Sequence, residues 1–214
     1  METYEKYCND DIFKVLNAIN EMWSDYYSCC HGKYHALFVA DTVEYILSSL
    51  FYDLRTVELG KIAGLLHDIG CIVGRRNHAR MSAAFATVHL DVSLFLPDER
   101  NIVVQAIEDH SAGNNISSVI GAALLIADKI DTSKKRRLPI GPTHIFYDEV
   151  SVEPIIDDVE INISNNIITI NYVTNDAFSI NKDQHPYNLI FKAAQYLRCT
   201  CCLEINGNEV YKFI

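Results

Sequence analysis

The chain has 214 residues and 49% of them are hydrophobic, which is enough for a real core in one domain or in a domain with a small appendage. The formal net charge is −10, which excludes a general nucleic-acid-binding or anionic-membrane-binding surface, because both need faces rich in lysine and arginine. The N-terminus lacks an export signal, and no apolar run reaches the roughly 20 residues of a membrane span. A cytoplasmic protein is expected.

Apolar residues at helical spacing predict three helices in the first seventy residues, over about 10–23, 34–50 and 58–69. Asn9 or Asp10 is a suitable N-cap for the first. In the third helix, residues three and four positions apart form a stripe that should face the core: Leu59, Ile62, Ala63, Leu66 and Ile69.

The adjacent pair His67-Asp68 lies at the end of this third helix and should therefore be buried. A buried imidazole and a buried carboxylate are costly unless each has a partner, and one divalent metal ion would satisfy both. The alternative is a hydrogen-bonded core histidine beside a helix end at Gly70.

Further along the chain, His78 starts a predicted helix, and Pro97 occupies the first position of another that ends at Asp109-His110. The next helix is strongly apolar but contains Asp128, an acid in a segment that should be buried. Upstream, His35 likewise opens an apolar helix. Three separate helices thus each contribute a residue of the kind that binds metals.

In this pattern of a His, a His-Asp doublet and a distant Asp, the sequence resembles the HD-domain metal-dependent phosphohydrolases over about residues 25–137. The resemblance implies a mainly α-helical HD-domain bundle. It also implies a divalent transition metal (Fe, Mn, Zn, Co or Ni) with four ligands: His35, His67, Asp68 and Asp128.

The activity implied is cleavage of a phosphate ester or anhydride in a nucleotide or another small phosphorylated metabolite, by metal-activated water. Asp68 would be both a ligand and the group that orients the water. Lys129 has two interpretations, a cation that offsets phosphate charge or a solvated lysine at a helix end.

His78 and His110 fall at helix ends where two-metal members of the family have further ligands, so one or two ions are expected, with Asp68 bridging them in the second case. The segment from His110 to Asp128 also has some likeness to the diadenosine-polyphosphate-hydrolysing branch. Lys129 replaces an aromatic residue of that branch, and Cys71 replaces a lysine that many relatives have after the doublet, so neither substrate nor phosphate contact is transferred.

The remaining histidines and the cysteines receive no catalytic role. His31 is interpreted as a loop residue or as a hydrogen-bond donor near the ligands. Structural or surface positions are expected for His89, His144 and His185. The seven cysteines should be reduced thiols, and Cys29-Cys30 and the cluster at 199–202 do not supply the paired C-x2-C motifs of a zinc site.

After residue 137 the pattern changes from helical to alternating, which predicts a helical domain over 1–137, a linker over 138–149 and a small α+β subdomain over 150–214. Asn165-Asn166 and Asn206-Gly207 predict two hairpins, separated by a helix that begins near Pro186. This ββαββ appendage is expected to cover the active site or to form a homodimer contact.

Two other functional classes remain open. One is an HD-fold di-iron oxygenase, which uses the same ligands with additional histidines. The other is a non-catalytic, metal-containing domain that senses a ligand. Metal analysis followed by a phosphate-release screen would separate these hypotheses from a phosphohydrolase.

Overall fold

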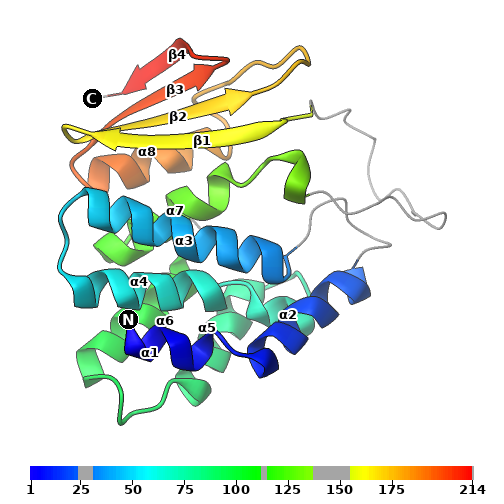
Figure 1. Ribbon diagram of the computed structural model, residues 1–214, viewed down its shortest axis with the longest axis vertical. Helices are drawn as coiled ribbons and strands as arrows, with labels where there is room; N and C mark the ends of the chain where they lie inside the picture. The colour runs from blue at the N-terminus through cyan, green and yellow to red at the C-terminus, as the bar shows by residue number, and fades with distance from the viewer. Residues whose placement is uncertain (24–30, 112–114, 137–154, 214) are drawn as a thin grey trace.

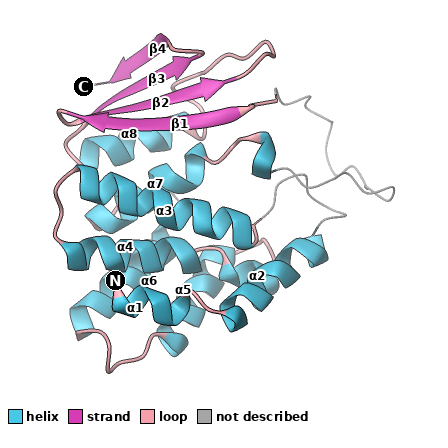
Figure 2. Ribbon diagram, in the orientation of Figure 1, coloured by secondary structure: helices cyan, strands magenta, loops and turns pink. Residues whose placement is uncertain are grey.

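A computed structural model describes residues 1–23, 31–111, 115–136 and 155–213. It shows a mostly helical protein with a four-stranded sheet at one end (Figures 1 and 2). The predicted linker, 138–149, lies outside the described residues. Within them, no helix combines the length and apolar character that crossing a bilayer requires.

The first part of the chain forms four helices, and the pair that matters for the site is α3 with α4. Asn9 caps α2, since its side-chain oxygen accepts from the backbone N–H groups of Asp11 and Ile12. The helices are α1 (Glu2–Tyr7), α2 (Asp10–Trp23), α3 (Lys33–Ser49) and α4 (Leu54–Leu66). The short α1 was not predicted from the sequence.

Helix α4 lies at the centre of the helical part, between α3 and the helices that follow it (Figure 1). All residues from Val57 to Leu66 are buried except Lys61, which is intermediate. The prediction of a single core-facing stripe was therefore too narrow, because a helix surrounded by others buries its whole circumference. Gly64 allows the close approach of α3, since a Cβ there would lie 2.7 Å from Ala40 Cα.

The remaining helical elements are η1 (Ile69–Ile72), α5 (His78–His89), α6 (Pro97–Asp109), α7 (Val119–Ile130) and η2 (Lys134–Arg136). The starts predicted at His78 and Pro97 are confirmed. Helix α7 begins after Ser118, whose hydroxyl accepts from the Gly121 N–H at 3.0 Å. Most of α7 is buried, so Asp128 lies in an apolar setting as expected.

The C-terminal part contains β1 (Asp158–Ser164), β2 (Ile167–Val173), α8 (Tyr187–Tyr196), β3 (Thr200–Ile205) and β4 (Asn208–Phe213). Both predicted hairpins are present, but β2 and β3 pair in parallel, so the sheet is mixed. The ββαββ description was therefore right in element order and incomplete in topology. The sheet covers α8, which packs against α7, and β1 also contacts α3 (Figure 1). The sheet thus rests on the two helices that carry His35 and Asp128.

Candidate metal centre

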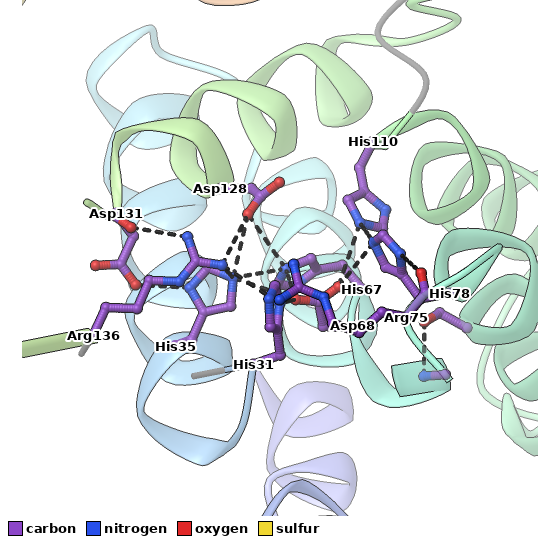
Figure 3. Close-up of polar contacts among 12 residues, drawn as sticks. His31, His35, His67, Asp68, Arg75, His78, His110, Asp128, Asp131 and Arg136 are labelled. Atoms are coloured by element: carbon purple, nitrogen blue, oxygen red, sulfur yellow. Dashed lines mark hydrogen bonds and ion pairs between the residues drawn. The ribbon is translucent and has the colours of Figure 1, made fainter. Parts of the chain in front are cut away.

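Residues far apart in the sequence converge beside the end of α4 (Figure 3). His35 comes from the first turn of α3, His67 and Asp68 follow the last turn of α4, and Asp128 comes from the last turn of α7. All four residues are buried, and none is more than 6% exposed. The predicted burial of the His-Asp doublet is therefore confirmed.

The donor atoms of His35, His67 and Asp128 form one compact group. His35 Nε2 lies 3.1 Å from His67 Nε2 and 3.3 Å from Asp128 Oδ1. Ligand bonds of about 2.1 Å at tetrahedral or octahedral angles place neighbouring donors roughly 3.0–3.4 Å apart. These separations therefore match the edges of a metal coordination shell.

A second group forms on the other side of Asp68, from α5 and the end of α6. His78 Nε2 is 3.2 Å from His110 Nε2, and these two nitrogens lie 3.3 and 3.5 Å from Asp68 Oδ1. The other carboxylate oxygen, Oδ2, lies 3.3 Å from His67 Nε2. Asp68 therefore faces both groups, one with each oxygen, which is the arrangement of a carboxylate that bridges two ions.

Hydrogen bonds behind the rings decide which nitrogen of each histidine faces the centre. Carbonyl oxygens lie 2.7, 2.9 and 2.6 Å from the Nδ1 atoms of His67, His78 and His110, respectively. A carbonyl can only accept, so each Nδ1 carries the proton and each neutral ring directs the Nε2 lone pair inward. Lone pairs this close repel one another unless a positive charge, a proton or a metal ion, lies between them.

His35 is oriented by a carboxylate instead, because its Nδ1 lies 2.7 Å from Asp131 Oδ2. A carboxylate behind a ligand histidine fixes the ring and raises its basicity. Burial and the Arg136 guanidinium lower the pKa of His35, but the surrounding carboxylates outweigh both and raise it to about 9. The donor group therefore attracts positive charge strongly.

Both central carboxylates are held in the ionised form. Burial raises the pKa of Asp68, but the adjacent His67 and His31 imidazoles outweigh burial and bring it well below its usual range. Burial likewise opposes ionisation of Asp128, and there the Lys129 ammonium is the largest opposing influence. Two ionised carboxylates among inward-facing imidazoles form a donor set that suits Fe, Mn, Zn, Co or Ni.

The structure disagrees with one of the two predicted roles of Lys129, and the other, contact with a phosphate, stays a prediction. Its Nζ lies 2.7 Å from Asp128 Oδ2, and the side chain is only 16% exposed. It is therefore not a solvated lysine at a helix end. Its charge already has a partner, so contact with a phosphate would require that ammonium to be shared.

Sequence reasoning missed Asp131 and Arg136 and left the role of His31 open. His31 Nδ1 lies 2.6 Å from Asp68 Oδ2, which favours the interpretation of a donor near the ligands. Asp131, three residues after Asp128, is 1% exposed, and this spacing within a buried helix end was the available signal. Arg136 belongs to a basic run that indicated only a domain boundary.

Other candidates lie away from the centre or outside the described residues. His89 stacks on Phe85 with ring centroids 4.0 Å apart, and His185 is exposed. His144, Cys29, Cys30 and most of the loop after His110 are not among the described residues. In the part that is described, Cys199, Cys201 and Cys202 are free thiols that join no cluster of metal-donor side chains.

Neither a known family model nor a curated protein matches the chain. Among solved structures, it is similar to a predicted HD superfamily hydrolase from an uncultured Thermotogales bacterium. The identity is 28% and the TM-score 0.44, and the similarity covers 55% of this chain and 66% of that chain, just under two thirds of the neighbour. The buried His and Asp cluster fits the HD motif. Nothing in the comparisons supports the diadenosine-polyphosphate branch.

Proposed function

We propose that the protein is an HD-type metal-dependent phosphohydrolase that cleaves a phosphate ester or anhydride of a nucleotide or another small phosphorylated metabolite. The observation that supports this most directly is the convergence of four Nε2 atoms, from His35, His67, His78 and His110, around the Asp68 carboxylate. Such a donor set leaves coordination positions for water and substrate.

The residues have distinct roles in this proposal. His35, His67, Asp68 and Asp128 would hold the first ion, and His78 and His110, with Asp68, would hold a second. A bound divalent ion would lower the pKa of a coordinated water and polarise the phosphoryl group. Asp68, already ionised, orients that water by accepting a hydrogen bond. Lys129 stabilises Asp128 as an anion.

The charge of the centre supports an anionic substrate. With the histidines neutral, as they are when they bind a metal ion, Asp68, Asp128 and Asp131 contribute three negative charges, and Lys129 and Arg136 contribute two positive ones. The balance of −1 becomes +1 with one divalent ion and +3 with two. A buried site with a positive surplus needs an anion, and a phosphate group together with hydroxide provides it.

The proposal is tested by elemental analysis of the purified protein, followed by a phosphate-release screen over nucleotides and general phosphoesters. We expect a transition metal and turnover of at least one substrate class. His67→Ala should lose both, since it removes a ligand from a buried polar cluster, whereas His89→Gln, outside the cluster, should retain both. Full metal and full turnover in His67→Ala would refute the assignment.

The second group of histidines also favours a second candidate, the HD-fold di-iron oxygenase. That enzyme would contain two iron ions and consume oxygen without releasing phosphate. Metal without either turnover would instead indicate the ligand-sensing domain. The same preparation, tested for oxygen uptake, therefore separates the three functions.

A further inference from the structure

Arg136 extends from η2 into the donor groups just described (Figure 3). Its Nη2 lies 3.2 Å from His35 Nε2, 3.5 Å from His31 Nδ1 and 3.9 Å from Asp128 Oδ1. Its Nη1 donates to the Asp131 carbonyl at 2.8 Å, and the side chain is 11% exposed. A nearly buried guanidinium therefore points at the atoms that we assign to the first metal ion.

A metal ion bound to the first group would replace the contacts that Nη2 makes with His35 and Asp128. His35 Nε2 and Asp128 Oδ1 are the donor atoms of the first group, so an ion bound there uses the same electron pairs. The Nη1 contact to the Asp131 carbonyl is separate, so it can hold the side chain beside the group while Nη2 turns away from the ion. An ion bound there would add a second positive charge beside this nearly buried guanidinium, and an anion that contacts both would offset the two charges.

Two neighbouring side chains, Cys71 and Lys129, are less suited than Arg136 to bind this anion. Cys71 is fully buried, and a thiol carries no positive charge with which to bind an anion. The Lys129 ammonium is already paired with Asp128 at 2.7 Å. Arg136 also presents the planar fork of N–H donors that matches phosphate oxygens.

We propose that Arg136 binds a phosphoryl oxygen of the substrate, next to the first metal ion. This inference rests on the proposed function, because it assigns a contact for the phosphate of that same site. Arg136 is then a substrate-binding residue. Its side chain is 11% exposed and lies beside imidazoles, whereas that of its neighbour Lys135 in η2 is 52% exposed.

The test measures binding of inorganic phosphate to the metal-loaded full chain by titration calorimetry, at saturating metal. Arg136→Gln should weaken phosphate binding by about tenfold or more, since it removes a charge-assisted hydrogen bond. Arg136→Lys, which keeps the charge without the fork, should lie between Gln and wild type. Lys135→Gln is the matched control, because this exposed neighbour pairs with Asp158 at 3.1 Å, and it should bind phosphate as wild type does.

Two further readouts separate substrate binding from a purely structural role. Added guanidinium ion should partly restore phosphate binding to Arg136→Ala, which a disturbed η2 would not allow. In the turnover assay, Arg136→Gln should raise KM for the phosphorylated substrate, while metal content per chain stays at the wild-type value. Wild-type phosphate affinity in Arg136→Gln, or equal losses in Arg136→Gln and Lys135→Gln, would overturn the proposal.

Failure of this inference is distinguishable from failure of the proposed function. Hydrolysis with phosphate affinity independent of residue 136 would refute the role of Arg136 and leave the phosphohydrolase standing. Phosphate binding that depends on Arg136, without turnover of any phosphoester, would refute the hydrolase and support the anion contact.

Discussion

At the scale of single residues, the burial of the four proposed ligands, His35, His67, Asp68 and Asp128, could be predicted from the sequence, because each is a polar side chain in or beside an apolar helix. His35, His67 and Asp128 interrupt runs that should be buried, and burial of a polar group demands a partner. Asp131 and Arg136 were not recoverable in this way. Asp131 follows the end of α7, and Arg136 lies among basic residues that look like ordinary surface.

Asp131 provides a prediction that tests the support behind His35. Asp131→Asn keeps the volume of the side chain but removes the charge that orients the imidazole through the 2.7 Å contact. We expect metal affinity to fall roughly 10- to 100-fold, as is typical when such a partner is lost. Competition with a fluorescent chelator measures this affinity. Unchanged affinity would show that His35 needs no carboxylate behind it.

His78 and His110 provide a prediction about metal count. If both hold a second ion beside Asp68 Oδ1, the double variant His78→Gln/His110→Gln should bind one ion fewer per chain and lose most turnover. Elemental analysis with protein concentration from amino-acid analysis gives the ratio. A ratio equal to that of wild type, with full activity, would leave only the mononuclear centre.

At the scale of elements, the sequence predicted where helices begin better than it predicted which elements pack around them. Pro97 and His78 begin helices where expected, because N-terminal signals are local. The burial of α4 on all sides depends on which helices pack around it, which no local pattern records. Parallel pairing of β2 with β3 was also missed, since a hairpin, a helix and a second hairpin can join through either edge of the first hairpin.

The contact between η1 and α5 gives a prediction at this scale. A Cβ on Gly70 would lie 2.4 Å from the Ser82 backbone nitrogen and 2.5 Å from the His78 carbonyl oxygen. Gly70→Ala should therefore displace the start of α5, cost about 1–3 kcal/mol of stability and weaken the second ion more than the first. Gly121→Ala is the matched control, because its Cβ would meet no atom closer than 3.5 Å. Thermal unfolding and metal stoichiometry report the two effects.

At the scale of the whole molecule, a charged network joins the N-terminus to α4 and α6. Glu58 accepts from the backbone N–H groups of Thr3 and Tyr4, and its neighbour Arg55 binds both Glu58 and Glu99. Burial raises the pKa of Glu58, yet the Arg55 hydrogen bond and the backbone donors lower it more. The pKa of Glu99 is lowered chiefly by Arg55.

These shifts predict how stability depends on pH. Carboxylates whose pKa is lower in the folded than in the unfolded protein stabilise the fold fully above about pH 5, and that stability is lost as pH falls below about 4.5. Glu58→Gln should cost roughly 1–3 kcal/mol at neutral pH, since it leaves buried donors poorly matched. Its stability should also fall less steeply between pH 5 and 3 than that of wild type. The free energy of unfolding, measured by urea denaturation at each pH, gives this comparison. An equal pH dependence of that free energy in Glu58→Gln and in wild type would contradict the assignment.

The shared position of Asp68 between α3, α4, α5 and α6 has a consequence for folding as well as for chemistry. An ion that joins His35 to His67 connects positions 32 residues apart, and one that also binds Asp128 fastens the helix on which α8 and the sheet rest. Such an ion stabilises the fold because it binds the folded protein, in which these donors are assembled, in preference to the unfolded chain, in which they are far apart. Chelation should therefore lower the melting temperature of the entire protein, C-terminal sheet included, and readdition of metal should restore it in proportion to the logarithm of metal concentration.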